Sequence, residues 1–167
     1  MYGTITASFG EYNSANKFYE SLLTRGYTWN DITVIMSEET RKNLPDHMSV
    51  KEEWSNAGTG AMVWGTIGWI IGAILALGTT AIIPGLGLVV AGPILGALVG
   101  WWAGWAVGTL VGALTDAGVS EEQATLYEKN IRNGDIVFVI SPKTADDETF
   151  FQNTATTYGR KDYYHYA

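Results

Sequence analysis

The sequence predicts an α+β protein in which a small α/β unit is interrupted by a long apolar helical hairpin. The first observation is the distribution of charge, because all ten Lys and Arg and all seventeen Asp and Glu residues lie in 1–53 and 116–167. The second is that the uncharged block 54–115 holds fourteen of the twenty glycines and six of the seven tryptophans. The third is that both flanks alternate between strand-like and helix-like patterns. We therefore expect one discontinuous domain, 1–53 plus 116–167, and a separate hydrophobic unit, 54–115.

Composition excludes several classes of function. A net charge of −7 leaves no basic surplus to neutralise phosphates, so no nucleic-acid partner is expected. The chain has no cysteine and only two histidines, which removes disulfides, thiolate metal sites and cysteine nucleophiles. We expect no catalytic residues, no cofactor and no metal. The N-terminus lacks a basic start followed by an apolar segment, which favours a cytoplasmic protein, in one alternative held at the inner membrane.

The N-terminal flank has a β-α-β pattern. Residues 4–9 alternate and are rich in strand formers, which predicts a strand. Asn13 or Ser14 is suited to cap a helix that runs to about Arg25, and Gly26 suits the left-handed position after it. Residues 32–36 then predict a short buried strand.

The C-terminal flank continues this pattern. Ser120 and Gln123 have the spacing of a capping box, and the helix that follows ends at Asn133-Gly134. Residues 136–140 predict a second buried strand, and Thr144 with Asp147 begins a third helix. The tyrosine-rich tail is an edge strand, an oligomer contact or disordered. With the helices on one face of the sheet, the two flanks would form a split ferredoxin-like unit.

The uncharged block predicts two helices, 61–83 and 93–114, joined by a turn near 84–92. Glycines recur at every fourth residue along the second helix, and further glycines lie on one row of the first. Such rows let two helix backbones approach closely, as in a glycine zipper. Large indole side chains in the second helix add contact area. We predict that these residues pack the helices and join copies of the chain: Gly92, Gly96, Gly100, Gly104, Gly108, Gly112, Gly68, Gly72, Trp101, Trp102 and Trp105.

Lipid and protein are alternative environments for this hairpin. Both predicted helices reach the ~20 apolar residues that a bilayer requires. Tryptophans prefer the membrane interfaces, however, and here they lie near the middle of each helix. A soluble assembly whose hairpins bury one another explains the tryptophans better. A monomer with this surface in water is not expected in either case.

Two stretches carry a resemblance to a known family. They are ITASFGEYNSANKFYESLLTRGYTWNDITVI at 5–35 and GVSEEQATLYEKNIRNGDIVFVI at 118–140. Together with the glycine-rich centre, they resemble the bacterial general stress proteins induced by heat, cold or salt. The resemblance implies a stress-associated protein and supplies no catalytic residues.

Other patterns have simple structural interpretations. His47 is expected in a loop and His165 in a tail contact, since neither has a second ligand at useful spacing. Residues 146–148 are acidic, as is common in a first helical turn. The glycines from Gly85 onward fit a turn better than a dinucleotide loop.

The expected function is therefore non-enzymatic. The protein would be a structural one that self-assembles through the glycine-zipper hairpin, at or in the membrane, with itself and membrane lipid as partners. One alternative is a soluble homo-oligomer or filament. Another is a binding module that encloses an apolar ligand such as a lipid or quinone.

Overall fold

The computed structural model of the chain describes residues 3–28, 31–42, 80–83, 88–92 and 110–166. These residues form an α+β protein, as predicted. In chain order the elements are β1 (Thr4–Phe9), α1 (Tyr12–Thr24), β2 (Ile32–Ser37), α2 (Glu38–Lys42), β3 (Thr80–Ile83), β4 (Leu88–Ala91), α7 (Leu110–Asp116), α8 (Glu121–Arg132), β5 (Ile136–Ile140), α9 (Ala145–Thr157) and β6 (Asp162–Tyr166).

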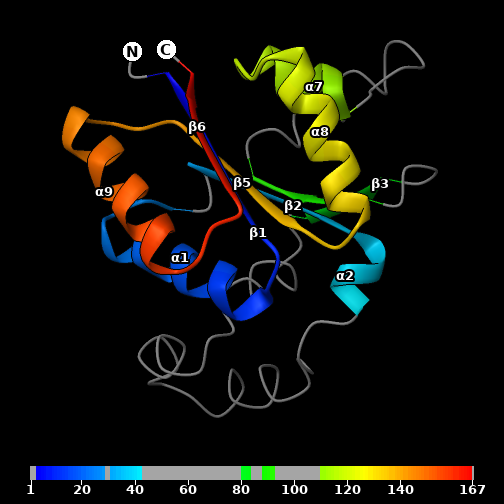
Figure 1. The fold of residues 1–167 in the computed structure, drawn as a ribbon, viewed down its shortest axis with the longest axis horizontal. Coiled ribbons are helices and arrows are strands. Elements are labelled where there is room, and N and C mark those ends of the chain that lie inside the picture. Colours follow the sequence, from blue (N-terminus) through cyan, green and yellow to red (C-terminus); the bar gives the residue numbers. More distant parts are fainter. Residues whose placement is uncertain (1–2, 29–30, 43–79, 84–87, 93–109, 167) are drawn as a thin grey trace.

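The strands form one six-stranded sheet in the order β3-β4-β2-β5-β1-β6, and all neighbours are antiparallel (Figure 1). β1 and β2 both pair with β5, so the connection through α1 passes over β5. In the same way, the connection through α9 passes over β1 to reach β6. The C-terminal tail is thus an edge strand, which is one of the three alternatives predicted for it.

Helices cover both faces of the sheet. α1 and α9 pack on one face, where Phe18 and Phe151 belong to the same core as Phe138 and other apolar side chains of the strands. α7 and α8 pack on the opposite face, where Tyr127 and Leu114 belong to a second core. The prediction that all helices share one face is wrong for residues 121–132. The physical reason lies in β5, whose five residues are all buried, so that apolar side chains on both of its faces need cover.

The predicted helical hairpin is wrong at the end of its first helix and in its turn, whereas residues 110–114, the end of its predicted second helix, are helical and belong to α7. Residues 80–83 are strand β3 rather than the end of a helix, and residues 88–91 are strand β4 rather than part of a turn. β4 pairs with β2, which joins this part of the uncharged block to the sheet of the flanks. Each run is short, rich in Ile and Val and bounded by Pro and Gly, and hydrophobic periodicity cannot separate such a run from a helix segment. No helix in the described ranges is long and apolar enough to cross a bilayer.

Most of the local signals in the flanks are confirmed. Gly26 and Gly134 have φ of +98° and +111° and follow α1 and α8, as expected for left-handed positions that end helices. Ser120 accepts a hydrogen bond from the Gln123 amide. The cap of α1 was predicted wrongly, because the N-cap is Glu11 and its side chain makes no capping bond. Asn13 and Ser14 lie inside that helix instead.

Candidate functional site

The structure describes two of the predicted helix-packing residues, Gly92 and Gly112. Gly112 lies within α7, half-buried, as the predicted helix requires. The other predicted positions lie outside the described residues: Gly68, Gly72, Gly96, Gly100, Gly104, Gly108, Trp101, Trp102 and Trp105.

Gly92 has a different role from the one predicted. It follows strand β4 with φ of +111°, so it is not part of a helix. A Cβ at this position would overlap the carbonyl oxygen of Ile32 and lie 2.8 Å from the Cα of Thr33. Only glycine allows this close approach of two backbones. Gly92 therefore holds the end of β4 against the beginning of β2.

The two ends of the β3–β4 hairpin lie next to each other. Thr80, the first residue of β3, pairs with Ala91, the last residue of β4. The uncharged segments 54–79 and 93–109 consequently join the sheet at neighbouring points. This end of the sheet is also where β5 finishes, because Ile140 pairs with Ile32. The loop after β5 and the loop before β2 meet here, and they carry the largest polar network that we find in the described part of the chain.

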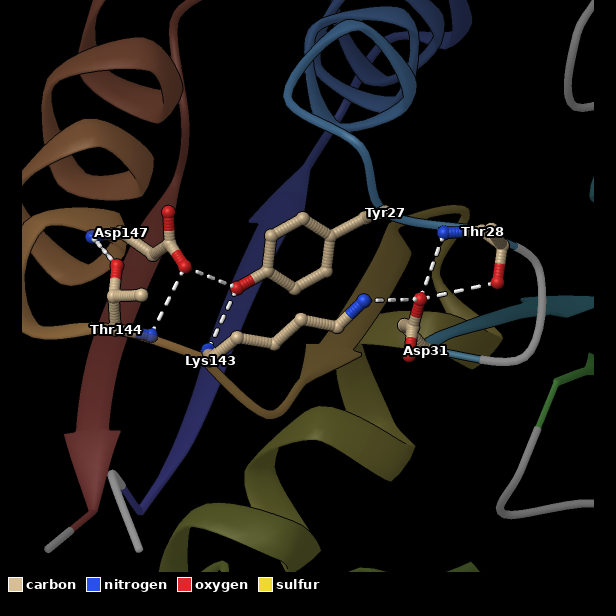
Figure 2. A network of polar contacts seen from close by, with 6 residues as sticks. All are labelled: Tyr27, Thr28, Asp31, Lys143, Thr144 and Asp147. Carbon is tan, nitrogen blue, oxygen red and sulfur yellow. Dashed lines mark hydrogen bonds and ion pairs between the residues drawn. The ribbon is translucent and has the colours of Figure 1, made fainter.

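Asp147 is the centre of this network (Figure 2). It lies in the first turn of α9 and is only 4% exposed. Its carboxylate accepts hydrogen bonds from the Tyr27 hydroxyl at 2.7 Å, from Arg25 Nε at 2.9 Å and from the Thr144 amide at 3.0 Å. Burial alone would raise the pKa of this carboxyl, but the bonds from Tyr27, Arg25 and Thr144 outweigh burial and lower the pKa to about 2. Asp147 is therefore ionised, and both of its carboxylate oxygens accept hydrogen bonds.

Lys143 connects this centre to the loop before β2. Its backbone amide donates to the Tyr27 hydroxyl, and its ammonium lies 2.9 Å from the Asp31 carboxylate and 4.7 Å from the centre of the Tyr27 ring. Asp31 also accepts from the amide and hydroxyl of Thr28. Although burial tends to raise the pKa of Asp31, the bonds from Thr28 and Lys143 lower it.

A second polar cluster lies on the opposite face, under α8. The hydroxyls of Thr6 and Tyr127 hydrogen-bond to each other, and Thr4 donates to the carbonyl of Ala117. Burial raises the pKa of Tyr127, so this phenol is neutral. The capping box predicted at Ser120 has only its hydroxyl arm, in which the Ser120 side chain accepts from the Gln123 amide. The cluster fixes β1 to α7 and α8.

The two histidines have separate positions. His165 lies in β6, and its Nε2 is 3.4 Å from a carboxylate oxygen of Glu148, in agreement with a tail contact. His47 lies outside the described residues. Within the described ranges, no three acidic or histidine side chains gather closely enough to hold a metal ion.

These contacts tie together segments that are far apart in the sequence. Each carboxylate oxygen of Asp147 accepts at least one hydrogen bond, and the Tyr27 hydroxyl both donates and accepts. The capping role of Thr144 and Asp147 was readable from their spacing. Arg25 and Tyr27 were missed because they lie some 120 residues away along the chain and no local pattern links them to Asp147.

Comparison of the chain with protein-family models, with curated proteins and with solved structures finds no match. The function must therefore be argued from the chain itself.

Proposed function

We propose that this chain is a non-enzymatic protein that self-assembles through its two uncharged segments, 54–79 and 93–109. The observation that carries the proposal is the pairing of Thr80 with Ala91 at the end of the β3–β4 hairpin. It brings the two segments to the same end of one folded domain as neighbours. Segments without any charge that start side by side are well placed to pack on each other and on those of other copies.

The anchoring of the hairpin supports this arrangement. Strand β4 has three buried apolar residues, each at most 1% exposed: Leu88, Val89 and Val90. Val89 belongs to the core on one face of the sheet, and Leu88 and Val90 belong to the core on the other face. Burial of three such side chains stabilises the folded domain by several kcal/mol, at about 1.5–3 kcal/mol each. The β3–β4 hairpin is thus anchored in the domain, and the uncharged segments are connected to the two ends of this hairpin.

Strand order supports a finer description of the domain. In the part β2-β5-β1-β6 of the sheet, the connection from β1 to β2 crosses over β5, and the connection from β5 to β6 crosses over β1. The helices of these two connections, α1 and α9, lie on the same face of the sheet. This is the pattern of a split β-α-β unit, and we propose a ferredoxin-like unit with the uncharged block inserted between β2 and β5. The resemblance to bacterial general stress proteins adds the proposal that the assembly serves in the stress response.

One observation favours protein over lipid as the cover of the uncharged segments. The acidic first turns of α8 and α9 lie at the end of the sheet where the segments join it. They would face an anionic lipid surface with like charge.

The test is the size of the assembly formed by two glycine variants of the full chain. Gly100→Leu and Gly104→Leu should force close-packed helices apart and reduce the particle mass seen by light scattering, because a leucine side chain does not fit a glycine row. Gly10→Leu is the matched control. Gly10 is exposed and has no left-handed φ, and a Cβ there lies 3.2 Å from the flexible Lys161 side chain and 3.8 Å, an ordinary contact distance, from the Asp135 carboxylate. Unchanged mass for both variants would contradict the proposal.

A further inference from the structure

The outer edge of β6 is an unpaired strand edge with an exposed aromatic side chain. Among the described strands β6 pairs on one side only, with β1 (Figure 1). Tyr164, at its middle, is 41% exposed, and its ring stacks on that of Tyr166 at 6.3 Å. An edge strand offers free N–H and C=O groups to another strand. β6 is thus a candidate surface for a partner.

We propose that a second copy of this chain pairs with it along β6, antiparallel, about a two-fold axis at Tyr164. The two sheets then join into one continuous sheet. Such an interface is isologous, since each copy contributes the same strand. It involves the α+β domain rather than the uncharged segments, so it goes beyond the proposed function and provides a second, independent contact.

The sequence of β6 selects this register. A two-fold axis normal to the sheet leaves every side chain on the same face of the joined sheet in both copies. Directly opposite residues of antiparallel strands point to the same face, so the residue at the axis must lie opposite its own copy. An axis at Asp162 would set two carboxylates opposite each other, and an axis at Tyr163 would set Lys161 opposite His165. The axis at Tyr164 sets Asp162 opposite Tyr166 and Tyr163 opposite His165, with no like charges facing. Cross-strand pairs of aromatic residues are favourable.

The charges beside β6 are complementary in this register. The Arg160 guanidinium lies over the Tyr163 ring, 5.5 Å from its centre. Glu148 lies beside His165 and accepts, through its backbone carbonyl, from the Tyr163 hydroxyl. When Tyr163 of one copy is opposite His165 of the other, Arg160 approaches Glu148 of the second copy, and the two-fold axis repeats the pair.

Helix α9 extends this complementarity. Its first turn carries the acidic residues 146–148, its last turn carries no acidic residue, and Arg160 and Lys161 follow its end. The two-fold axis makes the α9 helices of the two copies antiparallel. The acidic end of each then lies toward the basic end of the other. The charge pattern of α9 therefore favours a second copy over an unrelated acidic or basic partner.

A single cysteine tests the register directly, because the chain has none. In the full chain, Tyr164→Cys places two thiols opposite each other at the axis, where antiparallel strands hold Cα atoms about 4.5–5.5 Å apart, within the range of a disulfide. We expect mild oxidation to give a covalent dimer. Thr125→Cys, an exposed position on α8, is the control and should react far more slowly. Equal rates at the two positions would overturn the proposal.

A charge swap gives a second test that does not need cysteine. Glu148→Arg or Arg160→Glu alone should weaken dimerisation roughly tenfold, measured by sedimentation with the uncharged segments shielded by detergent. The double variant should restore dimerisation. Both positions also border Tyr163 within one chain, so the readout is the restored dimer mass and not the restored stability of a single copy. Failure of the double variant to restore the dimer, with a normal circular dichroism spectrum, would contradict the interface.

The two proposals fail separately. If the self-pairing of β6 holds and the uncharged segments do not assemble, Tyr164→Cys still cross-links but the unmodified chain forms nothing larger than a dimer. If the segments assemble and β6 does not pair, particles remain large while the cross-linking rate equals that of Thr125→Cys.

Discussion

Asp147 joins three parts of the chain that are far apart in sequence. It caps α9 through Thr144, pairs with Arg25 after α1, and accepts from Tyr27 before β2. The Asp147 side chain is 6% exposed and the Arg25 side chain is 37% exposed, so solvent reaches this ion pair mainly at Arg25. The hydrogen bonds to a buried charge make this a sensitive position for stability.

We predict that Asp147→Asn lowers the free energy of unfolding by about 2 kcal/mol, because hydrogen bonds to a buried charged group are lost or weakened. The neighbouring Asp146→Asn is a matched control, since Asp146 is exposed in the same helical turn, and it should change stability by less than ~0.5 kcal/mol. Urea denaturation of the two variants measures the difference. Equal effects would show that the network in Figure 2 does not stabilise the fold.

The same residue predicts how stability depends on pH. The pKa of Asp147 is about 2 in the folded chain, below the ~3.9 of an unfolded aspartate. Its contribution is therefore complete above pH ~4 and is lost as the pH falls toward 2. Between pH 5 and pH 2 the urea midpoint of the unaltered protein should fall more steeply than that of Asp147→Asn. Parallel curves would contradict an ionised, hydrogen-bonded Asp147.

At the scale of residues, the sequence predicts contacts that are local and misses those that are not. Thr144 and Ser120 were assigned as helix caps because an N-cap bonds to a residue three positions on. The partners Arg25 and Tyr27 depend on how α1 and α9 pack, which spacing along the chain does not encode.

At the scale of elements, Gly92 determines how the β3–β4 hairpin attaches to the sheet. Gly92 and Gly134 have the same φ, +111°, but a Cβ at Gly134 meets nothing within 4 Å. Gly134→Ala should therefore cost only the left-handed strain, about 1–2 kcal/mol. Gly92→Ala adds the overlap with Ile32 and should cost more. Urea denaturation of both variants separates strain from overlap, and equal losses would mean that the close approach is not required.

Most elements of the flanks were predictable, apart from the short helix α2, whereas in the described part of the uncharged block only the helical residues 110–114 were. Strands 4–9, 32–37 and 136–140 are bounded by caps and glycines that mark their ends. In the block, the four-residue repeat of glycine continues through Gly92 into Gly96, although Gly92 follows a strand. A repeat in sequence therefore does not establish a helix where Val and Ile runs and prolines interrupt it.

At the scale of the molecule, the described residues form one α+β domain, and the uncharged segments 54–79 and 93–109 are connected to it next to the paired residues Thr80 and Ala91. The sheet of this domain has a core on each face, and its buried Asp147 is paired with Arg25. Segments 54–79 and 93–109 contain no Asp, Glu, Lys or Arg. We therefore propose that these segments assemble the copies of the chain and that β6 forms a second contact between two copies.

Sedimentation equilibrium of the unmodified full chain in detergent-free buffer tests self-assembly most directly. The chain has a mass of 18.2 kDa. We predict a discrete particle containing several copies, whose mass persists on dilution because the uncharged segments are buried between subunits. A stable species of 18.2 kDa that remains in solution without detergent or lipid would contradict the account.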